Sequence, residues 1–161
     1  MKKIHCSHLL LISFLLLPTL LYSQRVVHMV LPNYPAQQVI EWTEQTLMTT
    51  LTAGYHEDVS EAANVRKRYL HLGWIPMQSF LREKLRVIGK QEIMLHPEPI
   101  TPPVIIQTED CEGASCWHVH QAFLIPELRN KVDFTALVIT ADPAHGSPFL
   151  IKSLSIASTD Y

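Results

Sequence analysis

The sequence predicts an α+β fold in which three helices come first and an antiparallel sheet follows. Apolar residues recur at helical spacing over residues 37–88, and at alternating positions in several short segments of residues 93–156. Turn residues separate those segments, as in strands joined by hairpins. Helices followed by strands are typical of folds that place the helices on one face of an antiparallel sheet. We therefore expect a single α+β domain over residues 37–158.

Length and charge narrow the class of protein further. The chain has 161 residues, which is enough for one domain with a hydrophobic core and too few for two. Its formal net charge is −2, and no run of basic residues forms a patch suited to phosphate backbones. We expect no nucleic-acid partner.

The first predicted helix covers residues 37–52, just after Pro35. Its apolar and threonine side chains fall within about half of the helix circumference, with Glu41, Glu44 and Gln45 on the other side. The residues expected to face the core are Val39, Ile40, Trp42, Thr43, Thr46, Leu47, Thr50 and Leu51. Because threonine is a poor helix former, packing against the sheet must hold this helix, which Gly54 is expected to close.

A second helix is predicted to begin at Asp58. Asp58 and Glu61 have the spacing of a capping box, in which each side chain satisfies an unpaired N–H group. The basic residues 66–68 stand in the last turns, where cations interact favourably with the helix dipole. We expect this helix to end at Gly73, because glycine tolerates the left-handed conformation found at helix C-termini.

A third helix is predicted over residues 76–88, beginning at Pro76. Proline suits a first helical position, where its missing N–H costs nothing. Between Gly73 and Pro76, Trp74 and Ile75 are expected to fold onto the core. The predicted structure is a helix–corner–helix that the tryptophan pins in place, and Phe80 belongs to the apolar face of the third helix.

Strands are predicted over residues 93–96, 104–108, 116–125, 132–140 and 150–156. Four prolines in residues 97–103 should prevent regular pairing and cross an edge or corner of the sheet. Residues 109–115 and 142–148 have the composition of turns. In the strand over 116–125, one face carries Trp117, Val119, Phe123 and Ile125, and the other carries Cys116, His118, His120 and Ala122.

The N-terminus has the pattern of a secretory signal peptide. Lys2 and Lys3 precede an apolar run over residues 9–21, followed by Tyr22, Ser23 and Gln24. The run has 13 residues, fewer than the roughly 20 that a permanent membrane helix needs. We expect a signal peptide over 1–23, cleaved after Ser23, and an extended lead over 24–36. The alternative is an uncleaved signal that anchors the protein in the membrane.

Export would leave one pair of cysteines. Cys6 is removed with the signal, and Cys111 and Cys116 remain. A cysteine pair in an oxidising compartment normally forms a disulfide. Four residues across a hairpin turn can bring the two Cα atoms within the roughly 4.4–6.8 Å that the bond requires. A metal or redox motif would more often show C-x-x-C spacing with further ligands, so we predict a structural disulfide.

His118 and His120 are the strongest sign of a metal site. Side chains two residues apart on a strand point to the same side, so both imidazoles could reach one metal ion. The candidates for a third ligand are His96, Asp110 and His145, and nothing in the sequence places any of them nearby. If the apolar face of this strand covers the core, both histidines face away from it. We assign no metal and no cofactor, and keep a metal site at His118 and His120 as the alternative.

No catalytic residue is predicted. The sequence contains no G-x-S-x-G, no H-E-x-x-H and no glycine-rich phosphate loop. Asp133 and Glu127 lie at predicted strand edges, with no partner implied. We expect a protein that is not an enzyme. The alternative is a small-ligand-binding or metal-dependent enzyme that uses His118 and His120 on a curved, helix-backed sheet.

Several apolar positions resemble a known family. The first helix carries Trp42, and the corner reads Tyr69-Leu-His-Leu-Gly-Trp74, followed by Phe80-Leu81 and Leu85. The strands carry Pro103-Val-Ile-Ile106 and Trp117-His-Val119. Over residues 39–156 this pattern resembles the DotI/IcmL/TraM (IcmL-like) family of type IVB secretion and conjugation systems. The shared positions are scaffold residues, so Trp42, Gly73, Trp74, Phe80 and Trp117 are expected in the core.

The resemblance implies a cystatin-like cone of the nuclear-transport-factor-two type. It also implies a periplasmic, non-enzymatic interaction or scaffold subunit of a bacterial type IVB (Dot/Icm-like) secretion system, or a soluble paralogue of such a subunit. The expected partners are other envelope proteins of the secretion system, or further copies of the same chain. Inner-membrane members of the family carry a permanent membrane helix, so anchoring in the inner membrane is the alternative to a free periplasmic protein.

Overall fold

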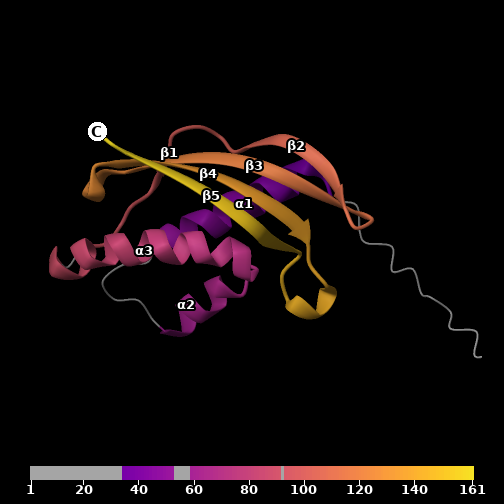
Figure 1. Ribbon diagram of the computed structural model, residues 1–161, viewed down its shortest axis with the longest axis horizontal. Helices are drawn as coiled ribbons and strands as arrows, with labels where there is room; N and C mark the ends of the chain where they lie inside the picture. The colour runs from indigo at the N-terminus through magenta and orange to yellow at the C-terminus, as the bar shows by residue number, and fades with distance from the viewer. Residues whose placement is uncertain (1–33, 53–58, 92) are drawn as a thin grey trace, which may run out of the picture. The chain divides into compact units, whose positions relative to one another are not determined.

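The computed structural model describes residues 34–52, 59–91 and 93–161, which form an α+β fold (Figure 1). In the described chain the helices come before the strands, as predicted. The helices are α1 (Ala36–Leu51), α2 (Val59–Arg66) and α3 (His71–Gln91). The strands are β1 (Glu98–Pro99), β2 (Val104–Cys111), β3 (Ala114–Ile125), β4 (Asn130–Thr140) and β5 (Phe149–Asp160). Short 3₁₀ helices, η1 (Pro126–Leu128) and η2 (Pro143–His145), follow β3 and β4.

Several sequence predictions lie outside the described residues. These are the signal peptide over 1–23, the extended lead over 24–36 except its last residues, the helix end at Gly54 and the cap at Asp58. Among the residues that are described, no helix is both long and apolar enough to span a membrane.

The strands form one antiparallel sheet with β3 and β4 at its centre. The order is β1-β3-β4-β5, and β2 pairs with the same edge of β3 as β1 does. Thr101, in the linker between β1 and β2, is held at this edge because the Gln121 side-chain amide donates a hydrogen bond of 2.8 Å to its carbonyl oxygen. The β4–β5 pairing begins directly after the second turn, at Thr140 and Phe149.

The prediction of a strand over residues 93–96 is wrong. The N–H of Ile93 bonds to the carbonyl of Ile88 at the end of α3, and the N–H of His96 bonds to the carboxylate of Glu127. Residues 93–96 are not part of a strand, although Leu95 is buried. Strand β1 lies instead inside the proline-rich run, where pairing was not expected. A two-residue edge strand tolerates Pro99 because few ladder hydrogen bonds are needed there.

The core lies between the sheet and the helices, which cover the same face of the sheet (Figure 1). Alternate residues of β3 and β4 point into it, in agreement with the period of two in the sequence. Three phenylalanines are completely buried there, namely Phe123, Phe134 and Phe149. Their rings meet other aromatic rings edge to face, including those of Trp42, Trp117 and Phe80. Such contacts add to the burial of apolar area.

Helix α1 packs with the face that the sequence predicts. Its buried residues are Val39, Thr43, Thr46, Leu47, Thr50 and Leu51. The hydroxyls of Thr43 and Thr50 donate to carbonyl oxygens one turn earlier, at 2.7 and 2.6 Å, whereas the buried hydroxyl of Thr46 has no hydrogen-bond partner among the described residues. The two local bonds satisfy the hydroxyls of Thr43 and Thr50 within the helix, which lets these polar side chains occupy a buried face.

The predicted break between the second and third helices is misplaced. Helix α2 ends at Arg66, and residues 67–70 run beside the edge of β5. The N–H of Leu70 bonds to the carbonyl of Ile151, and the N–H of Ile151 bonds to the carbonyl of Arg68, both at 2.9 Å. The chain therefore leaves the helix to pair with a sheet edge, which would otherwise present unpaired backbone groups.

Gly73 is buried inside α3 rather than at a helix end. A Cβ atom at this position would lie 2.5 Å from the carbonyl oxygen of Ile151 and 3.1 Å from its Cγ2 atom. Glycine is thus required for the close approach of the α3 and β5 backbones, not for a left-handed conformation. Pro76 lies within α3 too, so it does not begin a new helix. The N–H that it lacks would have served the carbonyl of Leu72, a residue that is 66% exposed and open to water.

Tyr69 anchors this junction from its buried position. Its hydroxyl lies 2.7 Å from Oγ1 of Thr50, whose own proton goes to the carbonyl of Thr46, so Tyr69 is the donor. Burial raises the pKa of Tyr69 far above its ordinary value, which keeps that proton in place. The Tyr69 ring also meets the ring of Trp74 edge to face, at 5.5 Å between centroids. Trp74 is partly buried, as expected, whereas Ile75 is 46% exposed and does not fold onto the core.

Candidate functional site

A tight turn joins β2 to β3 and fixes the geometry of the candidate site. Glu112 and Gly113 occupy its centre with φ values of +60° and +86°. Positive φ at both central residues is characteristic of type I′ hairpins, whose twist matches that of the strands. The carboxylate of Asp110 accepts a hydrogen bond of 2.9 Å from the N–H of Gly113. The turn is therefore shorter than the segment 109–115 predicted from composition, and the strands reach Cys111 and Ala114.

A disulfide joins Cys111 to Cys116 across this hairpin, with 5.9 Å between the Cα atoms. Cys111 pairs with Ala114 in the strand register, and Cys116 pairs with Glu109. The disulfide consequently links the strands diagonally next to the turn. Cys116 is completely buried, whereas Cys111 is partly exposed.

His118 and His120 lie on the outer face of the sheet, on the side away from the helices. Trp117 precedes His118, and Val119 lies between the two histidines. Both apolar residues are buried in the core, as the alternation of the sequence requires. The side chains of His118 and His120 are 28% and 36% exposed. Both histidines are thus surface groups on a strand and do not line the helix-facing side of the sheet.

The two histidines pair with carboxylates on different strands. Nε2 of His118 lies 3.1 Å from Oε1 of Glu109 on β2. Nε2 of His120 lies 3.5 Å from Oδ1 of Asp133 on β4, whose other oxygen is 3.2 Å from Nζ of Lys131. Because β2 and β4 flank β3 on opposite sides, the imidazoles are drawn apart and do not converge on one point.

The three candidates for a further metal ligand are each occupied elsewhere or distant in the chain. Asp110 caps the hairpin turn, and His145 belongs to η2 between β4 and β5. His96 lies at the other end of the sheet, where its Nδ1 is 2.7 Å from Oε1 of Glu127. Burial alone would raise the pKa of Glu127, but hydrogen bonds from its own backbone and from His96 outweigh this and lower the pKa.

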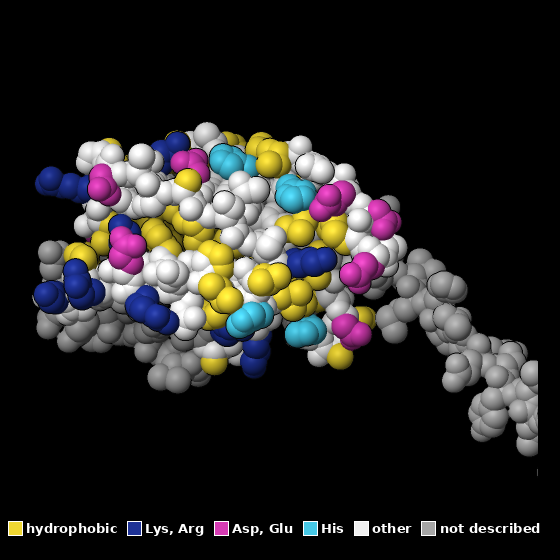
Figure 2. Space-filling view, in the orientation of Figure 1, with side chains coloured by type: hydrophobic (Ala, Val, Ile, Leu, Met, Phe, Trp, Pro, Cys, Tyr) yellow, Lys and Arg dark blue, Asp and Glu magenta, His cyan; other side chains and the backbone are white. Residues whose placement is uncertain are grey.

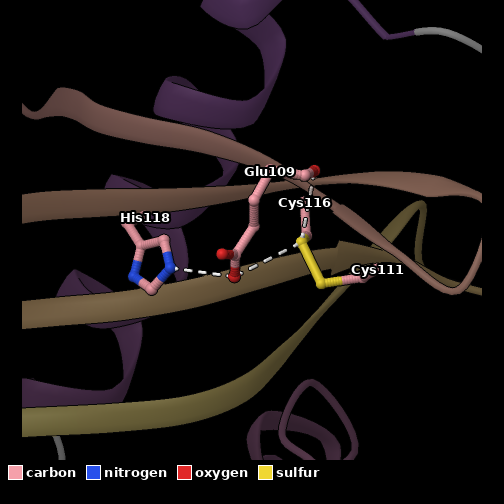
Figure 3. A network of polar contacts seen from close by, with 4 residues as sticks. All are labelled: Glu109, Cys111, Cys116 and His118. Atoms are coloured by element: carbon pink, nitrogen blue, oxygen red, sulfur yellow. Dashed lines mark hydrogen bonds and ion pairs between the residues drawn. A yellow bond between two sulfur atoms is a disulfide. The ribbon is translucent and has the colours of Figure 1, made fainter.

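Glu109 is the residue of this site that the sequence analysis did not single out. Figure 3 shows its carboxylate between the His118 ring and the disulfide. Oε1 of Glu109 lies 3.8 Å from Sγ of Cys116, a contact rather than a hydrogen bond because a disulfide sulfur carries no proton. The dipeptide Glu112-Gly113 is the feature of the sequence from which the position of Glu109 could have been predicted. A two-residue turn there fixes the register and places Glu109 opposite Cys116.

The remaining predicted site residues are distributed through the core. Trp117 and Phe80 are buried, and Trp42 and Trp74 are partly buried and pack against the core. Between the sheet and the helices, the described side chains are mainly aromatic and aliphatic. On the outer surface, basic side chains gather over the C-terminal half of α3 (Figure 2), where Arg82, Arg86 and Lys90 are exposed. A shallow groove of about 390 Å³ follows this surface, lined by Ser79, Arg82, Glu83 and Arg86.

Comparisons of the sequence alone do not assign the chain to a family. No protein-family profile matches it, and no curated protein matches it at a significant level.

Comparison with solved structures finds three proteins with a similar fold. The periplasmic domain of DotI superposes with a TM-score of 0.67 at 14% identity, over 78% of this chain and 97% of that domain. A periplasmic fragment of TraM gives a TM-score of 0.65 at 14% identity, over 79% of this chain and 100% of the fragment. An IcmL-like type IV secretion system protein from Legionella pneumophila gives 0.58 at 15% identity, over 81% and 97%.

These similarities cover nearly the whole of each solved domain, while the identities are too low to carry a function by themselves. They agree with the resemblance seen in the tryptophan, Gly73-Trp74 and strand positions of the sequence. The chain has the fold shared by the periplasmic domain of DotI, the periplasmic fragment of TraM and the IcmL-like protein from Legionella pneumophila.

Proposed function

We propose that this protein is a non-enzymatic, periplasmic interaction or scaffold subunit of a type IVB (Dot/Icm-like) secretion system, or a soluble paralogue of such a subunit. The observation that carries the proposal is the shared fold, which extends over 97–100% of the three solved domains. Two of those domains are described as periplasmic, and one is described as a type IV secretion system protein. We infer that the sheet and its helices belong to the cystatin-like cone of that family.

The arrangement of the side chains supports a role in binding rather than catalysis. Apolar side chains occupy the space between sheet and helices, where a cone-shaped enzyme would need a polar cavity. The histidines considered as ligands, His118 and His120, lie on the opposite face and pair with separate carboxylates. Exposed apolar residues occur instead along the edge formed by β2 and the linker before it, namely Ile100, Val104 and Ile106.

Location in the periplasm is supported by the sequence of the leader and by the disulfide. Lys2, Lys3 and the apolar run after them have the pattern of an export signal, and disulfides persist in oxidising compartments. Mass spectrometry of protein extracted from the envelope without reductant tests this directly. A species that begins at Gln24 supports cleavage after Ser23, whereas a full-length mass supports retention of the signal as an inner-membrane anchor.

In-cell photo-crosslinking tests the interaction itself. A photoreactive amino acid replaces Ile106, which is 59% exposed on β2, in a bacterium that carries the secretion system. We expect adducts with an envelope protein of the system or with a second copy of this chain, identified by mass spectrometry. The matched control places the same amino acid at Lys90, an exposed basic position of α3 away from that edge.

The two positions separate a specific contact from random collisions. Adducts enriched at Ile106 over Lys90 support the proposal and identify the partner. If neither position recovers a secretion-system protein or a second copy of the chain, the assignment to a secretion apparatus is wrong.

A further inference from the structure

Four side chains with metal-ligand chemistry meet where the β2–β3 hairpin closes. They are Glu109, Cys111, Cys116 and His118 (Figure 3). We propose that, once the disulfide is reduced, these four residues bind one thiophilic divalent metal ion, with Zn²⁺ as the expected ion. The proposal concerns the hairpin alone and does not depend on a role in secretion.

The spacing of the donor atoms fits such an ion. Oε1 of Glu109 lies 3.1 Å from Nε2 of His118 and 3.8 Å from Sγ of Cys116. Donor atoms of Glu109, Cys111 and Cys116 all lie within 4.8 Å of one another. Tetrahedral zinc, with bonds of about 2.0–2.3 Å, places neighbouring donor atoms roughly 3.3–3.8 Å apart. The carboxylate therefore already lies at the distance that a shared ion would require.

The hairpin supplies a suitable scaffold. Cys116 and His118 are two residues apart on β3 and share its outer face, and Glu109 faces Cys116 across the strand pair. The turn at Glu112 and Gly113 returns Cys111 to the same place. All four donors belong to residues 109–118, so the site needs no rearrangement of the helices. Two thiolates, one imidazole and one carboxylate form a closed four-ligand set of the kind that zinc accepts.

The disulfide keeps this site closed. Each sulfur is then bonded to the other and offers no thiolate to a metal. Opening requires a dithiol reductant, whose first thiolate attacks one sulfur and breaks the bond, and whose second thiol releases the mixed disulfide. Two electrons pass to the cysteines, two protons complete their thiols, and the reductant leaves as a disulfide. Zinc binding then releases those two protons to solvent as both cysteines become thiolates.

The surroundings of the disulfide distinguish this site from a simple covalent link. A disulfide that only joins two strands has no need of a carboxylate 3.8 Å from one sulfur that also pairs with an imidazole. His120 provides the natural contrast on the same strand face. It is similarly exposed, but its partner is Asp133 on β4, on the side of β3 opposite to β2, which carries Glu109 and Cys111.

Zinc titration of the untagged, exported chain tests the proposal. The protein is reduced with a phosphine and freed of excess reductant without oxygen, and Zn²⁺ is then partitioned against a chromophoric chelator. We expect one Zn²⁺ per reduced chain and none per oxidised chain. His118→Gln should weaken binding about tenfold or more, and His120→Gln should leave it unchanged. Thermal unfolding of each oxidised variant verifies that the fold is intact.

The zinc titrations either support or contradict a metal site at the hairpin. Binding that requires reduction, His118 and Glu109 supports the site, and Glu109→Gln provides a second independent variant. If reduced protein takes up no zinc, or if oxidised protein binds it equally, the proposal is wrong. Equal loss in the His118→Gln and His120→Gln variants would also overturn it, because that result would indicate nonspecific binding by surface histidines.

Discussion

The junction of α3 with β5 and the β2–β3 hairpin hold the protein together in different ways. At the junction, Gly73 lies against the backbone of Ile151, and Tyr69 bonds to Thr50, so segments far apart in the sequence fix one another. In the hairpin, the turn, the disulfide and the polar contacts all lie within residues 109–118. The junction consequently depends on long-range packing, and the hairpin depends on local chemistry. Mutations should affect the two regions by different routes.

Gly73→Ala should have the largest effect. The new methyl group would meet the Ile151 carbonyl oxygen at 2.5 Å, and because a backbone atom cannot move aside cheaply, α3 must shift from β5. We expect a loss of about 1–3 kcal/mol in the free energy of unfolding, measured by urea denaturation.

Gly89→Ala is the matched control in the same helix. A Cβ atom there has no neighbour within 4 Å, so the substitution should stabilise the helix by about 0.5–1 kcal/mol. If both substitutions changed stability equally, close backbone approach would not be the reason for glycine at position 73.

Removal of the disulfide should have the next largest effect. The double variant Cys111→Ala/Cys116→Ala should lose about 2 kcal/mol of unfolding free energy, because the bond closes only a short loop in the unfolded chain. A thermal melt with and without reductant measures this. Reductant should lower the wild-type Tm toward that of the variant and leave the variant itself unchanged. A reductant effect on the variant would point to a different cause.

Tyr69→Phe tests the junction more gently. It removes the donor to Thr50 in a buried place and should cost about 1 kcal/mol. The raised pKa of Tyr69 means that its contribution is complete below the unfolded value of about 10 and declines as pH rises above it. Wild-type stability should therefore decline in alkali more steeply than that of the variant. Tyr161→Phe, at a residue that is 62% exposed, serves as the control and should keep the wild-type slope.

Glu127→Gln should have the smallest effect. This contact joins the chain before β1 to η1, so it too is long-range, but it lies near the surface. The lowered pKa of Glu127 gives a contribution that is present above its unfolded value of about 4.3 and lost as pH falls through the folded value. We expect a loss of about 0.5 kcal/mol at pH 7 that disappears in acid. A difference that persisted at low pH would show that the carboxylate charge is not responsible.

The comparison also explains which sequence predictions succeeded. The alternation in residues 116–125 correctly assigned each side chain of β3 to a face, and helix α1 begins and ends close to its predicted bounds. Both depend on periodicity within one element, which the chain expresses locally. The disulfide could also be predicted from the sequence, because two cysteines near a turn have few alternative bonding partners.

The prediction failed where backbone groups find distant partners. Gly73 and Pro76 have the local pattern of a helix end and a helix start, yet α3 runs through both. The actual break at residues 67–70 follows from pairing with Ile151, a residue of the last strand. Likewise, residues 93–96 have the composition of a strand, but the N–H of Ile93 bonds to the end of α3 and the N–H of His96 bonds to Glu127.

The sequence by itself determined the class of the fold, the faces of α1 and β3 and the identity of the disulfide, because short-range periodicity and spacing express them. Only the tertiary structure decided why Gly73 must be glycine and where the second helix ends. It also brought Glu109 between His118 and the cysteines, on strands whose register a two-residue turn sets. For Gly73 and for the end of α2 the physical reason is the same, because each interaction joins backbones of separate elements and no single segment of the chain contains both partners. For Glu109 both partners belong to one hairpin, and the geometry of its two-residue turn decides which residues face each other.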